Sequence, residues 1–218
     1  MINSKQLLPS GVIKLTQHLP GPKVVIIGAL HGNERVGIAV IKRLTVILNK
    51  SKLYGTIYLI CGNPAAYRAN QRFISEDLNR LFTDELDAKN NPHKLKSVEK
   101  IRAQELKPLL ANANYLLDIH CTIKPSTPFV YCENTLHHLR LAKCFDAPYI
   151  VSPKAKSLPP SLISSTDSYI DRHGGIGLTY EAGWHKKPAP VKIIMASTLQ
   201  MLKIIGSIGQ DAQTAVKI

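Results

Sequence analysis

Long apolar runs are missing from this sequence of 218 residues. No stretch approaches the roughly 18 apolar residues of a membrane span, and the N-terminal MINSKQLLPSG lacks the apolar core of a signal peptide. Cysteine is also scarce, without the C-x-x-C spacing of a metal or redox motif, and a chain of this length needs no disulfides for stability. We therefore expect a cytoplasmic protein with no membrane partner and with reduced thiols at Cys61, Cys121, Cys132 and Cys144.

Acidic and aromatic residues are few. The sequence has 28 Lys and Arg against 15 Asp and Glu, a net charge of +13, and only 6% aromatic residues. A specific nucleic-acid partner would need this charge gathered on one face, preferably with stacking aromatics, but the basic residues are scattered. We expect a mostly solvated basic surface, in which a few cations bind a small anionic molecule.

The apolar residues that are present predict an α/β protein. Short apolar segments rich in β-branched residues predict strands at 12–15, 24–27, 56–60, 115–119, 128–131, 149–151 and 176–180. Helical spacing predicts helices at 36–47, 101–109, 136–144 and 193–204. The alternation indicates a three-layer α/β/α sandwich with a mixed, mostly parallel central sheet. Without repeats or linkers, we expect a single domain over residues 1–218, and the polar stretch 62–92 is expected to be a functional loop rather than core.

A His and a Glu follow the second predicted strand. His31 and Glu34 stand three residues apart in the turn that leads into a helix. Ligands of open α/β sheets bind at the carboxyl ends of the strands, and zinc accepts imidazole nitrogen and carboxylate oxygen. The alternative is that His31 is a turn residue and Glu34 favours the helix N-terminus.

A second His ends the strand predicted at 115–119. His120 would supply a third zinc ligand, and Asp118 lies on the same face of the strand, where its carboxylate could support the site. A lone His at this position would more simply be a satisfied core residue. Cys121 points to the opposite face and is expected to be core rather than ligand.

The loop 62–92 carries a candidate anion site. Arginine binds a carboxylate through two parallel hydrogen bonds, and an adjacent amide can complete the grip. Asn79 and Arg80 offer this pair, with Arg68 and Arg72 nearby. The alternative is a solvated charge cluster in which Arg pairs with the acids at 76–77.

The last predicted strand ends in a carboxylate, Glu181. A carboxylate at the end of a buried strand is costly unless it has a function, and beside a metal that function is general base toward water. The alternative is an ion pair with Lys186 or Lys187.

Taken in order, the motifs H-G-N-E, N-P, an Arg eight before the Arg of D-L-N-R, D-x-H and E-x-G resemble the aspartoacylase and succinylglutamate desuccinylase family of the zinc carboxypeptidase clan. The matches span residues 28–183. The resemblance implies a zinc carboxypeptidase-like fold and one zinc ion per chain, held by His31, Glu34 and His120.

The resemblance also implies roles for the remaining motif residues. Glu181 would be the catalytic base, Arg72 would polarise the scissile carbonyl, and Asn79 with Arg80 would bind a substrate carboxylate. Arg68 competes with Arg72 for its role.

One departure from the family pattern follows Glu181. Only 37 residues remain, enough for a final helix but not for the β-rich C-terminal domain of longer members. A further carboxylate-binding Arg, placed by the family shortly before the catalytic Glu strand, would be Arg172, although its spacing fits poorly.

These observations predict a zinc hydrolase that cleaves the amide bond of an N-acyl amino acid or a similar small carboxylate. Two alternatives stay open. One is a carboxypeptidase or amidase acting on peptide-like substrates, and the other is a non-catalytic, metal-dependent binding protein. The acyl group, the amine and the oligomeric state are not predicted.

Overall fold

A seven-stranded mixed sheet forms the centre of the protein in the computed structural model, which describes residues 8–17, 19–83, 97–153, 164–187 and 190–210. The strands are β1 (Val12–Thr16), β2 (Lys23–Gly28), β3 (Thr56–Cys61), β4 (Tyr115–Thr122), β5 (Phe129–Tyr131), β6 (Tyr149–Val151) and β7 (Ile176–Trp184). The helices are α1 (Val36–Leu48), α2 (Pro64–Ala69), the 3₁₀ helix η1 (Leu78–Arg80), α3 (Val98–Ala111), α4 (Leu136–Ala142), α6 (Thr166–Arg172) and α7 (Val191–Ile204).

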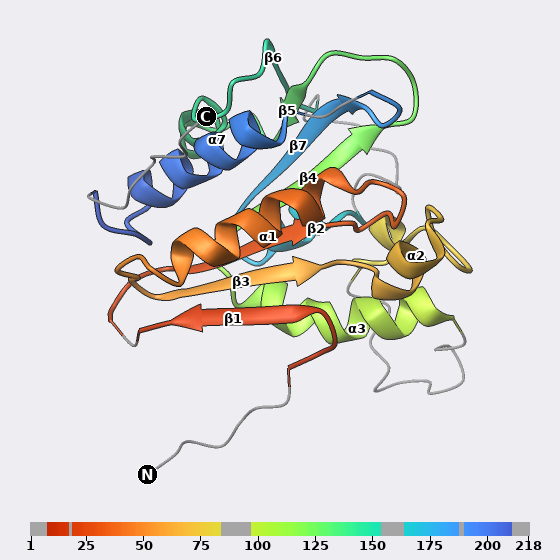
Figure 1. Cartoon of the computed structure of the whole chain (residues 1–218), viewed down its shortest axis with the longest axis horizontal. Coiled ribbons are helices and arrows are strands. Elements are labelled where there is room, and N and C mark those ends of the chain that lie inside the picture. Colours follow the sequence, from red (N-terminus) through yellow and green to blue (C-terminus); the bar gives the residue numbers. More distant parts are fainter. Residues whose placement is uncertain (1–7, 18, 84–96, 154–163, 188–189, 211–218) are drawn as a thin grey trace.

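The strand order is β1-β3-β2-β4-β7-β5-β6 (Figure 1). β2 is parallel to both β3 and β4, and β4 is parallel to β7. β1 is antiparallel to β3, and β5 is antiparallel to β7. The predicted mixed, mostly parallel sheet is therefore confirmed, and all seven predicted strands are present.

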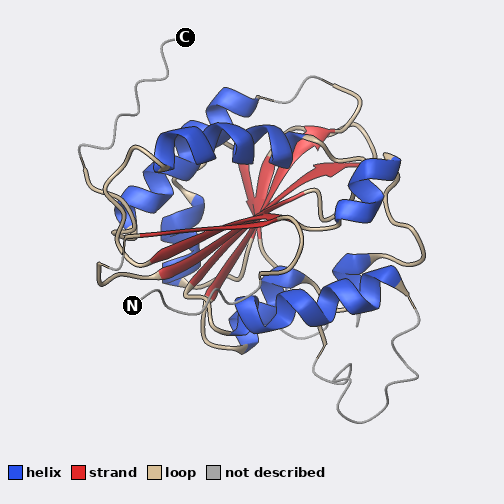
Figure 2. Ribbon diagram, turned by 60° about the horizontal axis from the view of Figure 1, so that its bottom comes forward, coloured by secondary structure: helices blue, strands red, loops and turns tan. Residues whose placement is uncertain are grey.

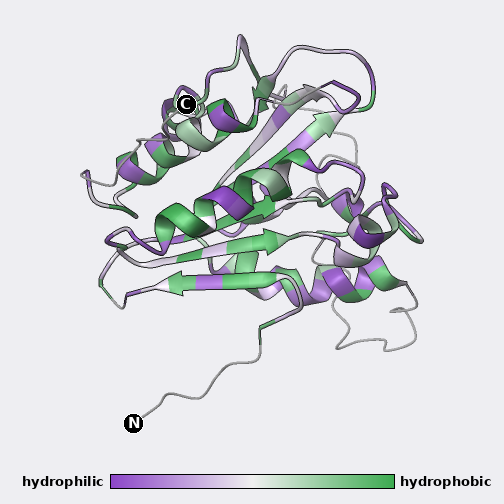
Figure 3. Ribbon diagram, in the orientation of Figure 1, coloured by the Kyte–Doolittle hydropathy of each residue, from purple (hydrophilic) through white to green (hydrophobic). Residues whose placement is uncertain are grey.

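Helices cover both faces of the sheet (Figure 2). Alternate residues of β2 point to opposite faces, so Val24 and Ile26 belong to one core cluster while Val25 and Ile27 belong to the other. The first cluster includes side chains of α1, α4 and α7, and the second includes side chains of α3 and α6. Figure 3 shows the corresponding pattern, in which β2 and β3 are apolar along most of their length while the helices alternate in hydropathy. The predicted three-layer sandwich is confirmed.

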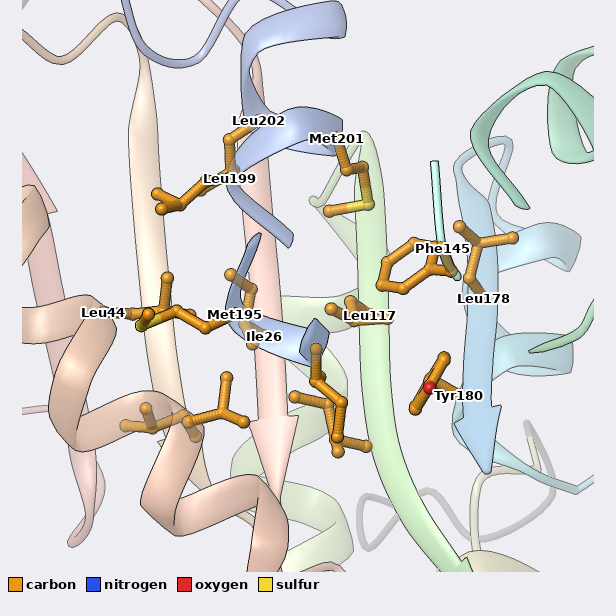
Figure 4. Close-up of a cluster of buried hydrophobic side chains, with 14 of the residues drawn as sticks. Ile26, Leu44, Leu117, Phe145, Leu178, Tyr180, Met195, Leu199, Met201 and Leu202 are labelled. Atoms are coloured by element: carbon orange, nitrogen blue, oxygen red, sulfur yellow. The ribbon is translucent and has the colours of Figure 1, made fainter. Parts of the chain in front are cut away.

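The larger cluster lies between the sheet and the helices α1 and α7 (Figure 4). Ile26 and Leu117 from the sheet meet Leu44 of α1 and Met195 of α7, and all four are buried. Burial of a large apolar side chain contributes about 1.5–3 kcal/mol to stability, so this packing holds α1 and α7 against the sheet.

Two expectations about burial are corrected. The stretch 62–92 was expected to lie outside the core, but Leu78 and Phe82 within it are fully buried, because this segment folds back over the second core cluster; residues 84–92 lie outside the described part. The helical spacing that predicts helices at 101–109 and 193–204 counts Ile101 and Ile193 among the apolar positions, but these residues are 49% and 43% exposed. Leu106, which belongs to the same predicted spacing as Ile101, is fully buried as expected, and Ile194 rather than Ile193 lies on the buried face of α7.

The four cysteines are free thiols. Within the described residues, no helix is both long enough and apolar enough to cross a membrane.

Candidate functional site

The site lies at the carboxyl ends of the central strands β2, β4 and β7 (Figure 1). The strands are adjacent and parallel, so their carboxyl ends are aligned. Gly28 is paired with Ile119, and His120 is paired with Glu181. The register therefore brings together residues 28, 120 and 181, which are far apart in the sequence.

A close approach of backbone segments shapes the turn between β2 and α1. A Cβ atom on Gly28 would lie 2.5 Å from the carbonyl carbon of Gly37, so only glycine lets the first turn of α1 approach the end of β2 this closely. Ala29 follows with a positive φ of 53°, a strained conformation for a residue with a side chain. The turn then places His31 and Glu34 just beyond the carboxyl end of β2, where each residue is 3% exposed.

His31, Glu34 and His120 form a compact group of potential metal ligands. The Nδ1 atom of His31 lies 2.9 Å from Oε1 of Glu34, and Nδ1 of His120 lies 3.1 Å from Oε2 of the same carboxylate. The two Nδ1 atoms are 3.2 Å apart. Two imidazole nitrogens and one carboxylate are a donor set that zinc accepts, and all three residues are buried.

The other ring nitrogen of each histidine faces a carboxylate. Nε2 of His31 lies 2.9 Å from Oδ1 of Asp77, and Nε2 of His120 lies 3.0 Å from Oδ2 of Asp118. The hydroxyl of Thr166 donates a hydrogen bond to the same Asp118 oxygen. Carboxylates in this position fix the ring orientation of metal-binding histidines and leave Nδ1 for the ion. Asp118 was anticipated in this supporting role, and Asp77 was not.

The electrostatics of the group favour a charged Glu34. Burial alone would raise its pKa, but hydrogen bonds from His120 and His31 outweigh burial and lower the pKa well below the usual range of a glutamate. Glu34 also accepts a hydrogen bond from the backbone N–H of Cys121. Burial raises the pKa of the Cys121 thiol to about 12, which keeps it protonated and unsuited to metal binding.

Arg72 lies beside this group, with its two terminal nitrogens 2.9 Å from Oε1 of Glu34 and 3.3 Å from Oδ2 of Asp77. Its backbone carbonyl accepts a hydrogen bond from Gly32 in the turn after β2. The loop before η1 is held by Glu99 of α3, which accepts hydrogen bonds from the backbone of residues 74 and 75. The ion pair between an arginine of this loop and an acid at 76–77, given above as the alternative to an anion site, is therefore present between Arg72 and Asp77, and it places the guanidinium at the site.

Glu181 lies in β7, three residues before the end of the strand, and is paired with His120 of β4. Its Oε2 atom is buried and has no hydrogen-bond partner among the described residues. Burial, as the largest effect, raises the pKa of its carboxyl group. A buried carboxylate oxygen without a partner is costly and points to a bound group or water that this site is built to receive.

Two cavities meet at these residues. One has a volume of about 220 Å³ and extends past Asn79, Arg80 and Asp167, and the other has about 380 Å³ and extends past Thr122 and Lys124. Both are lined by a common set of residues, namely His31, Arg72, His120 and Glu181. A small substrate could therefore occupy both cavities with its reacting bond beside Glu181.

The predicted carboxylate-binding pair lies on the wall of the smaller cavity. The side-chain oxygen of Asn79 accepts a hydrogen bond from the backbone N–H of Thr166, which orients the amide. The exposed Arg80 side chain donates to the backbone carbonyl of Asn79.

Two predicted arginines lie elsewhere. Arg68 lines a separate cavity with Asn63 and Arg102. Arg172 donates hydrogen bonds to the backbone carbonyls of Phe82 and Ser168. Neither lines the two cavities described above, and their predicted contacts with substrate stay predictions.

Sequence reasoning missed the far wall of the smaller cavity, which is formed by Phe129, Tyr131, Ser165, Asp167 and Thr179. These residues come from β5, β7 and the start of α6, and they have no local motif. The available signal was Asp167 directly after two serines and a threonine, but that pattern also describes an ordinary helix start.

A model of the succinylglutamate desuccinylase/aspartoacylase catalytic domain matches residues 20–203 of this chain. A probable aspartoacylase from Acaryochloris marina is 38% identical over 106 residues, which cover 46% of this chain and 35% of the relative. A succinylglutamate desuccinylase from Shewanella denitrificans is 37% identical over 119 residues, which cover 48% of this chain and 33% of the relative. The matched region thus spans about a third of the length of either relative.

The fold has known counterparts too. The crystal structure of a succinylglutamate desuccinylase/aspartoacylase from Rhodobacter sphaeroides matches with a TM-score of 0.71 at 23% identity, covering 91% of this chain and 60% of that one. The likeness extends over almost the whole sheet and its helices.

Proposed function

Because this chain belongs to the succinylglutamate desuccinylase/aspartoacylase family, we propose that it is a zinc-dependent hydrolase that cleaves the amide bond of an N-acyl amino acid or a similar small carboxylate. The observation that carries the proposal is the buried group of His31, Glu34 and His120 next to the unpartnered oxygen of Glu181. A binding module would need the first feature but not the second.

His31, Glu34 and His120 would hold the ion. When bound, zinc supplies a Lewis acid that polarises a carbonyl and lowers the pKa of water to about 7. Asp77 and Asp118 would keep the two imidazole rings oriented toward the ion.

Glu181 would act as general base and then as general acid. Its carboxylate accepts a proton from the attacking water, and its raised pKa makes it a better proton acceptor than an ordinary glutamate. The same carboxyl group returns the proton to the departing amine nitrogen. This transfer completes the cleavage of the amide bond.

Arg72 and the pair Asn79 and Arg80 would position the substrate. Arg72 lines both cavities and can donate a hydrogen bond to the oxygen of the scissile carbonyl as negative charge develops there. Asn79 and Arg80 would bind the carboxylate of the amino acid in the smaller cavity.

Metal analysis of the purified protein, joined to a deacylation screen, tests the proposal. We expect about one zinc per chain, lost in both His31→Ala and His120→Ala and retained in His137→Ala, which changes an exposed histidine outside the group. Full zinc occupancy in both of the first two variants would refute the ligand assignment.

The screen measures the amine released from N-acetyl and N-succinyl derivatives of acidic, neutral and basic amino acids. Each substrate is paired with its carboxamide analogue, which lacks the carboxylate that Arg80 would bind. We expect the wild type to prefer the carboxylate and Arg80→Lys to lose much of that preference, since an ammonium cannot form the two parallel hydrogen bonds of a guanidinium. Release from peptides but from none of the N-acyl amino acids would instead support a peptidase.

A further inference from the structure

One buried carboxylate in the smaller cavity has no part in the proposed mechanism. Asp167, the second residue of α6, is 5% exposed and lines the same cavity as Asn79 and Arg80. Among the described residues that line this cavity, Asp167 and Glu181 are the carboxylates. Glu181 is already assigned as the base. The negative charge of Asp167 therefore needs another explanation.

The protein itself compensates this charge only in part. The Asp167 carboxylate accepts hydrogen bonds from the hydroxyl of Ser165 and the backbone N–H of Ser168, and it lies in the first turn of a helix. Against these, burial and then the nearby carboxylates of Asp171 and Asp118 raise its pKa to about 6. At pH 7.5 the group is still mostly ionised. A buried carboxylate among other carboxylates is a favourable site for a cation.

The small size of the cavity determines which part of a substrate meets Asp167. When Asn79 and Arg80 bind the carboxylate and the scissile amide lies beside Glu181, the acyl group can extend into the larger cavity, and the side chain is the group left to face the opposite wall of the 220 Å³ cavity. In an N-acyl amino acid the α-nitrogen belongs to the amide and carries no charge. A positive charge can then come only from the side chain or the acyl group.

We propose that Asp167 determines substrate specificity by binding a side-chain ammonium group, so that the preferred substrates are N-acyl derivatives of diamino acids. Arg80 and Asp167 would then bind the two opposite charges of one small molecule. A side-chain carboxylate, as in an N-acyl aspartate or glutamate, would be repelled by Asp167. The inference rests on the proposed hydrolase function and adds the class of amine that the enzyme accepts.

The test compares two substrates of almost equal shape. Nα-acetyl-L-ornithine carries a terminal ammonium where N-acetyl-L-norleucine carries a methyl group. We expect the wild type to favour the ornithine derivative in kcat/KM by about 10- to 100-fold, the value of a hydrogen bond to a charged group. In Asp167→Asn, kcat/KM for the ornithine derivative should fall to that for the norleucine derivative, which itself should hardly change.

A matched control removes a negative charge close by. Glu133→Gln changes a residue whose charge acts on Tyr131 but which does not line the cavity, so the preference for the ornithine derivative should persist. An equal preference in the wild type and in Asp167→Asn would overturn the inference, and so would a wild type that favours the norleucine derivative.

Binding of the free amino acids separates this inference from the proposed function. Isothermal titration calorimetry with L-ornithine and L-norleucine needs no turnover, and we expect tighter binding of ornithine that Asp167→Asn abolishes. If no N-acyl amino acid is hydrolysed while ornithine still binds through Asp167, the hydrolase proposal fails and the ammonium site stands. If hydrolysis occurs without any preference for the ammonium, only the role of Asp167 is rejected.

Discussion

Glu181 and Asp167 are carboxylates on the wall of one cavity, and burial raises the pKa of both. Their hydrogen bonding differs. An oxygen of Glu181 has no partner in the described part of the chain, whereas Asp167 is held by Ser165 and the backbone of Ser168. A proton acceptor needs a free oxygen, and a group that orients a ligand needs a fixed one. This difference decides the roles assigned to the two residues.

Replacing Glu181 with Gln keeps the size of the side chain and removes its ability to accept a proton. A general base contributes about 100- to 10,000-fold in rate, so we expect kcat to fall by that factor. Zinc content and KM should hardly change, because Glu181 is outside the ligand group. Steady-state kinetics with metal analysis measures both. Loss of zinc in this variant would show instead that Glu181 is a ligand.

Asp167→Asn should alter the pH dependence of stability. The pKa of Asp167 rises from an ordinary value of 3.8 to about 6 in the folded chain, so between these pH values the folded chain binds more protons than the unfolded chain. The contribution of Asp167 to stability therefore falls as pH rises from about 4 to 6 and is constant above that range. Asn avoids this loss and should stabilise the protein by up to about 3 kcal/mol at pH 7.

Urea unfolding at pH 4 and pH 7 measures the effect, with the wild type at each pH as reference. At pH 4 the Asp167 carboxyl group is protonated in the folded chain, and the variant should match the wild type. A stabilisation of equal size at both pH values would contradict the assigned pKa.

At the scale of elements, the site depends on the contact between the end of β2 and the start of α1. A Cβ atom on Gly37 would lie 2.5 Å from Cα of Gly28 and 3.2 Å from the carbonyl oxygen of Ile119, and neither backbone atom can move away easily. Gly37→Ala should push α1 outward and displace Glu34, which precedes it. We expect a loss of about 1–3 kcal/mol in stability together with weaker zinc binding.

Gly209→Ala is the matched control for Gly37→Ala, because a Cβ at Gly209 would meet no atom within 4 Å. It should leave both stability and zinc affinity close to those of the wild type. Thermal unfolding and a competitive zinc titration check the pair. Unchanged zinc affinity in Gly37→Ala would mean that the position of α1 does not control Glu34.

Elements with a strong periodic pattern could be predicted from the sequence, and elements defined by tertiary packing could not. Residues 24–27 of β2 are all apolar, and residues 115–119 of β4 are apolar except for Asp118. These runs predicted both strands, and the positions of His31 after β2 and His120 near the end of β4 followed from them. The short helices α2 and α6 lack large aliphatic residues at helical spacing, whereas the equally short α4 has Leu136 and Leu139 three residues apart. Leu78 and Phe82 were missed as core because the residues around them are polar, and only the folded chain shows what covers them.

The same distinction holds for the site. Ligand types and spacing predicted the group of His31, Glu34 and His120, which the fold brings together. Asp77 faces His31 only because the loop before η1 folds back over the turn after β2. Asp167 enters the cavity from α6, and no sequence spacing relates it to Asn79 or Arg80.

For the whole molecule, zinc is expected to act as a stabilising ligand. An ion that binds only the folded chain stabilises it by about 2.7 kcal/mol when its free concentration is 100 times Kd. For a chain of this length, that corresponds to an increase in Tm of about 5–10 °C. Differential scanning calorimetry with zinc and with a chelator measures the shift. His120→Ala should show no zinc-dependent shift, and a shift of wild-type size in that variant would rule out this site as its source.

The distance along the chain between the proposed zinc ligands affects the folding kinetics that we expect. His31 and His120 are 89 positions apart in the sequence. They come together only when β4 pairs with β2, and the chain between these two strands includes α1, β3, α2 and α3. Such non-local parallel pairing forms slowly, so the complete ligand group should be absent from the folding transition state. Zinc would then leave the refolding rate unchanged and slow unfolding by the full factor of its stabilisation, which stopped-flow urea jumps with and without the ion can measure.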